Sequence, residues 1–200
     1  ICQVALSVIL LNGTGLLLKT MWSVKPVDPG FSSKNLLVGS IWLPPPGNPA
    51  ARKYETQDSR TIFIDKLLNR LKTMPGVSMA ALSTADAVPL VGWNSTPFRI
   101  EGIPETNGTS YSAQVSGVSA DYLRTIATRV ESGRDFTTAD RGDFKVALVN
   151  RALADRLWNG LNPIGRRIAV GRGPSPEWFE IVGLASDVKS QGFDKPSIPH

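Results

Sequence analysis

The chain of 200 residues contains one cysteine, Cys2, and one histidine, His200. A single cysteine cannot form an intrachain disulfide bond, which excludes a disulfide-stapled secreted fold. A lone histidine gives almost no support to a histidine-dependent triad or a histidine-rich metal site. The sequence also lacks a G-x-x-x-x-G-K-[ST] phosphate-binding loop, because no Lys-Ser or Lys-Thr pair closes the region from Gly165 to Gly173. These absences point away from an enzyme, a cofactor protein and a metal protein.

Clustered charge is also missing. The chain has 22 Lys and Arg against 17 Asp and Glu, a net charge of +5. The basic residues occur singly or in short pairs such as Arg52-Lys53 and Arg166-Arg167, with no aromatic residues interleaved in a basic stripe. Nucleic acid is therefore not an expected partner, and this mild basicity is typical of a solvated surface with some attraction to lipid headgroups.

Three carboxylates near one another in the sequence are the best candidates for acid–base chemistry: Glu131, Asp135 and Asp140. They fall in or beside a predicted turn, Gly133 to Phe136, where aspartate commonly accepts hydrogen bonds from backbone amides. The structural interpretation is favoured over a catalytic pair. No catalytic, cofactor-binding or metal-ligating residue is predicted.

What the sequence does contain is an uncharged run from Ile1 to Leu18, before the first charge at Lys19. As a helix these residues would rise about 27 Å, close to the ~30 Å hydrocarbon thickness of a bilayer. A cleaved signal peptide would begin with basic residues and end at small ones, unlike this segment. A buried core helix would show a polar face, whereas this segment would carry leucines on all sides of its helix. We predict a transmembrane helix over residues 1–21, with everything after Trp22 on one side of the membrane.

The remaining chain has the composition of a folded domain, since 42% of all residues are hydrophobic and 20% are charged. Residues 22–34 are predicted as a connector. Pro26 and Pro29 prevent a continuous helix there, and Asp28-Pro29-Gly30 favours a turn. Residues 35–200 then form the predicted domain.

A helix is predicted from Thr56 to Met74, because its apolar residues recur at the helical period. Leu36 to Leu43 before it and Val77 to Ser83 after it are predicted strands. This β-α-β unit should place the helix over a sheet. The apolar positions are Ile64, Leu67, Leu68 and Leu71.

The loop from Thr84 to Thr96 is unusually apolar. One interpretation is a loop folded back on its own core. The alternative is a partner-contact loop, since exposed apolar patches often mark interaction sites. The residues in question are Val88, Leu90, Val91 and Trp93.

Further elements complete an α+β fold class. A short helix is predicted to begin at Ser119 or Ala120, and a second helix is predicted after an N-cap at Asn150. Strands are predicted over residues 97–101, 113–118, 145–149, 166–170 and 178–184.

The order of motifs along the chain resembles a known family. The motifs are VDPGF at residues 27–31, MPGV at 74–77, GRDFTTAD at 133–140, LVNRALADRLWNGLNPIGRRI at 148–168 and EIVGLASDVKSQGFDKP at 180–196. Together they resemble the MacB-type periplasmic core domain of ABC transporter permeases in the FtsX-like class, in particular the duplicated orphan permease group.

This resemblance implies a transmembrane helix leading into a two-lobed extracytoplasmic domain of β-α-β units, truncated at the C-terminus. It implies a non-enzymatic permease subunit in the cell inner membrane that works with a separate cytoplasmic ATP-binding subunit and membrane lipid, and that forms a homodimer. The helix and the Val24 to Phe31 connector would transmit motion for export or mechanotransmission. The alternative function is a membrane-anchored binding or sensor module without a transport role.

Overall fold

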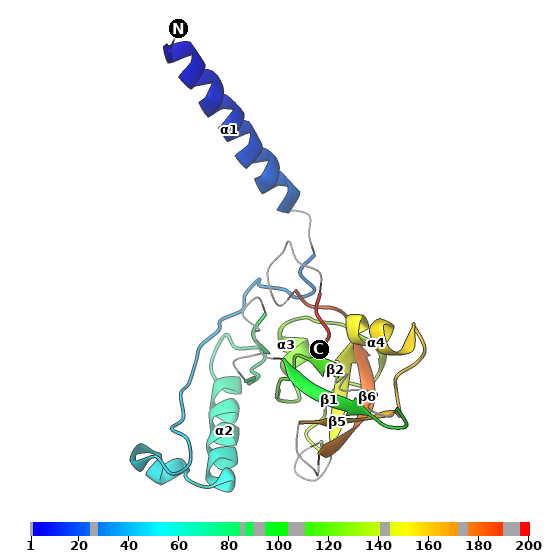
Figure 1. Cartoon of the computed structure of the whole chain (residues 1–200). Helices are drawn as coiled ribbons and strands as arrows, with labels where there is room; N and C mark the ends of the chain where they lie inside the picture. The colour runs from blue at the N-terminus through cyan, green and yellow to red at the C-terminus, as the bar shows by residue number, and fades with distance from the viewer. Residues whose placement is uncertain are drawn as a thin grey trace.

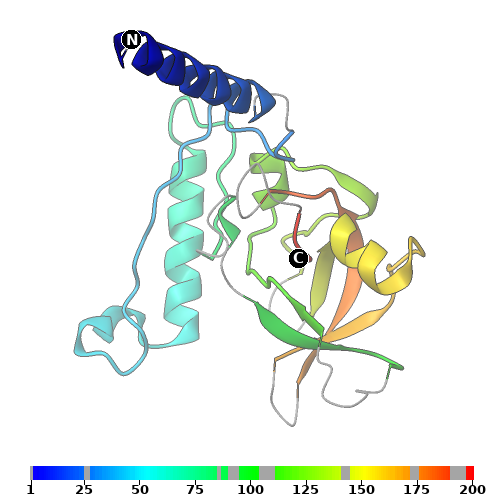
Figure 2. The same ribbon diagram turned by 45° about the horizontal axis from the view of Figure 1, so that its top comes forward.

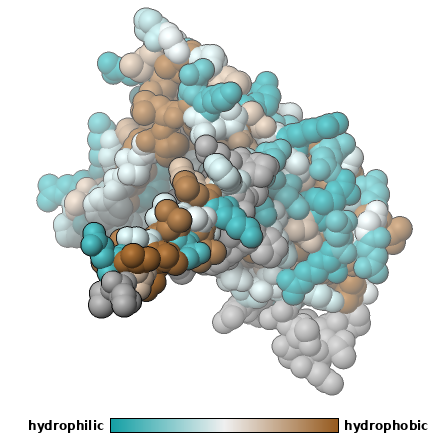
Figure 3. Space-filling model, turned by 90° about the horizontal axis from the view of Figure 1, so that it is seen from above, coloured by the Kyte–Doolittle hydropathy of each residue, from teal (hydrophilic) through white to brown (hydrophobic). Residues whose placement is uncertain are grey.

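The computed structural model describes residues 2–24, 28–84, 87–89, 95–103, 111–140, 145–171, 176–189 and 197–200 (Figure 1). It begins with helix α1, Cys2–Val24, which projects away from the rest of the chain. Seen from above, α1 carries brown, hydrophobic surface, whereas the body on the right is mostly teal (Figure 3).

Within the described residues, α1 is long and apolar enough between Gln3 and Trp22 to cross a membrane. Four of its polar side chains, those of Ser7, Asn12, Thr14 and Thr20, donate to carbonyls of the preceding turn. The Ser7 hydroxyl donates to the Gln3 carbonyl at 2.9 Å, and the Thr14 hydroxyl donates to the Leu10 carbonyl at 2.8 Å. Such bonds to the preceding turn let hydroxyls sit on an apolar helix.

Six strands form one sheet. Their order is β2-β1-β5-β6-β3, and β4 also pairs with β6. The pairing of β4 with β6 is parallel, and the other pairings are antiparallel. Strand β6 is central, because β5 and β3 lie along one of its edges and β4 along the other. The strands are β1 Thr96–Ile100, β2 Tyr111–Ala113, β3 Val130–Gly133, β4 Val146–Asn150, β5 Arg167–Val170 and β6 Glu177–Ala185.

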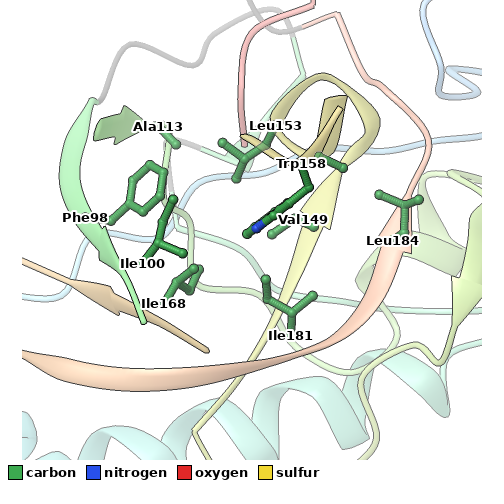
Figure 4. Packing of buried hydrophobic residues seen from close by; sticks show 10 residues of the cluster. Phe98, Ile100, Ala113, Val149, Leu153, Trp158, Ile168, Ile181 and Leu184 are labelled. Atoms are coloured by element: carbon green, nitrogen blue, oxygen red, sulfur yellow. The ribbon is translucent and has the colours of Figure 1, made fainter. Parts of the chain in front are cut away.

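Helix α4, Arg151–Trp158, follows β4 directly and covers the sheet. The Asn150 side chain caps it by accepting a hydrogen bond from the Leu153 amide at 3.0 Å. Its buried face and the sheet enclose the core, where Ile181 is 0% and Val149 1% exposed. Figure 4 shows the side chains of this core, which come from β1, β2, β4, β5, β6 and α4. The cluster comprises Phe98, Ile100, Ala113, Val149, Leu153, Ala154, Trp158, Ile168, Ile181 and Leu184.

The α+β class and the apolar first helix are confirmed. The strands predicted over 97–101, 145–149, 166–170 and 178–184 appear within one residue of their predicted ends. The short helix predicted near Ala120 is α3, Tyr122–Thr125, and the helix capped by Asn150 is α4.

The helix predicted between Thr56 and Met74 is also confirmed, as α2, Gln57–Lys72. The Thr56 hydroxyl caps it by accepting from the Ser59 amide at 3.2 Å. It packs against the 3₁₀ helix η1, Pro49–Tyr54, partly through Tyr54 and Phe63, whose ring centroids lie 4.9 Å apart.

The β-α-β unit predicted around α2 is wrong in this structure. Residues 36–43 are extended without strand pairing, and of residues 77–83 only Ser83 forms a bridge, to Val118. Helix α2 therefore stands beside the sheet rather than over it (Figures 1 and 2). An extended segment becomes a strand only when a neighbour supplies backbone partners, and no described residue does so here. We call residues 36–81 the α2 arm and the sheet with α3 and α4 the sheet body.

The strand predicted over residues 113–118 is likewise wrong for most of its length. Only Ala113 belongs to β2, and Val118 forms the isolated bridge. Strand β3 was not predicted. It has few apolar residues, and only its pairing with β6 makes it a strand.

Candidate functional site: the junction between the apolar helix and the sheet body

The first described residues after α1 form the turn that the sequence predicts. The Gly30 amide donates to the Asp28 carboxylate at 2.9 Å, and Gly30 has φ +77°. This left-handed conformation favours glycine. A Cβ on Gly30 would also overlap the backbone carbonyl oxygen of Asp187. The turn therefore lies directly against the segment that follows β6.

One side of this turn is bonded to the segment between α3 and β3. The Thr128 hydroxyl donates to the Gly30 carbonyl at 3.0 Å, and the Ser32 amide donates to the Ile126 carbonyl at 2.8 Å. Thr128 and Ile126 are 7% and 5% exposed. The connector is thus anchored on buried residues rather than on mobile surface side chains.

The other side is bonded to the end of β6. The Lys189 amide donates to the Pro29 carbonyl at 2.9 Å, and the Ser186 amide donates to the Arg129 carbonyl at 2.8 Å. We define the junction as residues 28–32, 126–129 and 186–189. It brings the VDPGF and SDVK motifs, far apart in the sequence, into contact.

The junction continues into helix α4. The Asp187 carboxylate accepts from the Ala152 amide at 2.9 Å, which satisfies a free donor in the first turn of α4. Beside it, Arg151 forms an ion pair with Glu131 of β3. That hydrogen bond raises the pKa of the Arg151 guanidinium. Glu131 therefore ties α4 to β3.

The other two carboxylates considered for catalysis accept hydrogen bonds within their own turn. Asp140 receives two hydrogen bonds from Arg134, at 2.6 and 2.8 Å, and one from the Thr137 amide at 2.7 Å. The bonds from Arg134, followed by the Thr137 amide, hold the pKa of Asp140 below its usual value. Asp135 accepts from the Phe136 amide at 2.7 Å. Over the described ranges, no group of three or more His, Cys, Asp or Glu side chains could hold a metal ion.

The candidate partner-contact loop is described only at its start. Val88 is half-buried, and Ala87 before it is buried, with its carbonyl accepting from the Tyr122 hydroxyl. Leu90, Val91 and Trp93 lie outside the described residues. The predicted contact role of these four residues stays a prediction.

The sequence predicts the turn at Asp28-Pro29-Gly30 but not the residues that hold it. Thr128 and Ser32 are ordinary polar residues without a motif, and Lys189 takes part through its backbone. Backbone bonds between distant segments leave no periodicity in the sequence. The only available signal was Asp-Pro-Gly, which predicts a turn but not its contact.

The profile of the family described as the MacB-like periplasmic core domain matches residues 28–198. The periplasmic region of MacB from Actinobacillus actinomycetemcomitans is 14% identical with a TM-score of 0.46, over 67% of this chain and 60% of that one. The extracellular domain of the noncanonic ABC-type transporter YknZ from Gram-positive bacteria is 18% identical with a TM-score of 0.43, over 67% and 68%. No curated protein matches the chain.

The chain spans about 60% of the MacB periplasmic region. The profile match begins at Asp28, the first residue of the junction, and ends at Ile198, so it includes all three junction segments. The resemblance inferred from the order of motifs is therefore confirmed, and the chain belongs to the MacB-like periplasmic core domain family.

Proposed function

We propose that the chain is a non-enzymatic permease subunit of an ABC-type transporter of the MacB/FtsX-like class. Its family and its apolar helix indicate a membrane-anchored protein with an extracytoplasmic domain. The sequence contains no phosphate-binding loop. In this proposal a separate cytoplasmic subunit hydrolyses ATP, as the resemblance to MacB/FtsX-like permeases implies, and this chain transmits the resulting motion for export or mechanotransmission.

The proposal places α1 in the lipid of the cell inner membrane and the residues after Trp22 on the periplasmic side. Trp22 at the end of the apolar span supports a position at the membrane surface, because Trp is common where a span meets the headgroups. The periplasmic side is supported by the family. A homodimer is part of the proposal, because the resemblance to MacB-like permeases implies dimeric outer domains.

The junction is the observation that carries the proposal. A displacement of α1 reaches residues 28–32 first, and these are bonded to two segments of the sheet body. Residues 126–129 run into β3, and residues 186–189 follow β6. Strands β3 and β6 pair with each other, with Gly133 opposite Gly183. Motion of α1 would therefore be passed to β3 and to the central strand β6.

A flexible insertion tests this coupling. Six residues of Gly-Ser placed between residues 24 and 25 lengthen the tether without touching the junction. The full-length protein is reconstituted with its partner ATPase in lipid nanodiscs. Hydrogen exchange at residues 126–133 and 180–189 is compared with and without ATP. We expect an ATP-dependent change in the wild type that disappears in the insertion variant, while ATP hydrolysis continues.

The same insertion between Asn159 and Gly160, in the turn after α4, is the matched control and should leave the ATP response intact. An unchanged response in the 24/25 variant would refute transmission through the junction. Failure of the wild-type chain to copurify with any ATPase would instead favour a membrane-anchored binding or sensor module.

A further inference from the structure

The sheet is closed by the last described residues. The Gln114 amide, just after β2, donates to the Pro199 carbonyl at 3.0 Å. The Asn150 amide, at the end of β4, donates to the His200 carbonyl at 2.8 Å. Residues 197–200 thus bridge β2, at one end of the run β2-β1-β5-β6, and β4, which pairs with β6 at its other end. The backbone hydrogen bonds therefore form a ring.

A cavity of about 220 Å³ lies within this ring and extends under α3. Its wall is made mainly of aliphatic and aromatic side chains from the strands and both neighbouring helices. None of the described residues that line it is Asp, Glu, Lys or Arg. Its principal apolar members are Phe98, Ile126, Val149, Leu153, Ile168 and Phe179.

Most polar groups on the wall are already bonded. The Tyr122 hydroxyl donates to the Ala87 carbonyl, and the side-chain amide of Asn150 donates to the Ile198 carbonyl at 2.8 Å. His200 also lines the cavity, and burial lowers its pKa, which keeps the imidazole neutral. Ser116 differs, because its buried hydroxyl has no hydrogen-bond partner in the described part of the chain.

We propose that this cavity binds a small, neutral, largely apolar molecule with one hydrogen-bonding group, which pairs with the Ser116 hydroxyl. An apolar cavity of ~150 Å³ stays dry and binds benzene, so this larger space suits a molecule with two fused rings. A charged ligand is disfavoured, because a buried charge without a partner loses its hydration. The unpaired hydroxyl supplies the one polar contact such a site needs. The inference is independent of the transport role.

Indole is a suitable probe, since it has two fused rings and one N–H donor. It is titrated into the full chain in detergent, and methyl NMR signals are followed. We expect saturable shifts at the methyl groups of Ile126, Val149 and Ile168. The methyl groups of Ile9 and Ile62, on α1 and α2, report non-specific partition into detergent and should shift linearly or not at all.

Ala147→Phe should abolish saturation, because Ala147 lines the cavity and packs on the core beside it. Ala50→Phe, at an exposed position of η1, is the matched control and should bind as the wild type. If Ala147→Phe does not fold, Ala147→Leu fills less of the same space and should weaken binding. Shifts that do not saturate, or that persist equally in the filled variant, would overturn the proposal.

Ser116→Val tests the polar contact separately. It should weaken indole binding about fivefold, the loss expected for one neutral hydrogen bond, and leave naphthalene binding unchanged, because naphthalene has no donor. Ser112→Val, an exposed substitution in β2, is its control. Equal weakening of both probes by Ser116→Val would show that the hydroxyl does not contact the ligand.

Discussion

The sheet body and the α2 arm have similarly apolar sequences but very different burial. In the sheet body Ile181 and Val149 are almost completely enclosed. In the α2 arm Leu37 is 96% and Trp42 74% exposed, and α2 buries only Leu68. A helix satisfies its own backbone and can stand alone on one side of a domain, whereas an extended segment needs a neighbour. Apolar pattern alone therefore predicts helices better than strands.

The largest expected effect comes from substituting alanine for one large apolar residue in each region. Ile181→Ala should lower the free energy of unfolding by about 2–5 kcal/mol, because it leaves a new cavity at a fully buried position. Leu37→Ala should change it by less than about 0.5 kcal/mol, as for most surface substitutions. Denaturant unfolding of the full chain in detergent measures both. A comparable loss for Leu37→Ala would mean that the α2 arm is covered rather than exposed.

The stability costs of replacing two glycines, Gly30 and Gly47, compare the junction with the α2 arm. Gly30 and Gly47 both have positive φ, +77° and +82°. A Cβ on Gly30 would overlap the Asp187 carbonyl oxygen, whereas a Cβ on Gly47 would meet nothing within 4 Å. Gly47→Ala should therefore cost about 1–2 kcal/mol from backbone strain alone, and Gly30→Ala roughly 1–3 kcal/mol more from crowding.

Hydrogen exchange shows which backbone hydrogen bonds each substitution weakens. Gly30→Ala should speed exchange at the amide of Ser32, whose acceptor is the Ile126 carbonyl, and Gly47→Ala should not. Equal costs for the two substitutions would show that the turn is not held tightly against Asp187.

These contrasts explain what the sequence could and could not predict. Helix α4 and strands β4 and β6 were found because a cap at Asn150 and continuous apolar runs are local signals. Strand β3 was missed, since Val130–Gly133 owes its state to pairing with β6. Residues 36–43 were wrongly predicted as a strand, because their side chains suit a strand but no described segment pairs with them.

The same logic holds for the candidate site. Asp28 and Gly30 could be assigned to a turn from their side-chain chemistry. Their contact with residues 126–129 and 186–189 depends on backbone groups, which every residue has, and no residue pattern predicts it. The family motifs include residues 28–31 and 186–189 but not 126–129, and they do not show that these segments touch.

The turn from Arg134 to Asp140 offers a pH-dependent comparison with the uncharged core. Asp140 has a pKa held below its ordinary 3.8, first by hydrogen bonds from Arg134. A lowered folded-state pKa stabilises the protein above the unfolded value and loses that stabilisation as the pH falls through the folded one. Asp140→Asn should cost about 1–2 kcal/mol at pH 7.

The cost of Asp140→Asn should shrink as the pH falls below 3.8, as measured by denaturant unfolding across pH. Arg134→Lys keeps the charge but not the paired hydrogen bonds, so it should lose part of the stabilisation. A cost that stays constant down to acid pH would show that the carboxylate charge is not what stabilises the turn.

The smallest effect is expected where the α2 arm meets the sheet body. Lys72 at the end of α2 lies 2.6 Å from the Asp121 carboxylate beside α3, and this hydrogen bond is the first cause of the lowered pKa of Asp121. Both side chains are partly exposed, at 42% and 21%, so solvent and salt screen their attraction. Lys72→Met should change the free energy of unfolding by about 0.5 kcal/mol or less, and by still less in 1 M salt. A loss several times larger, insensitive to salt, would mean that this pair fixes the arm on the body and that the two regions unfold together.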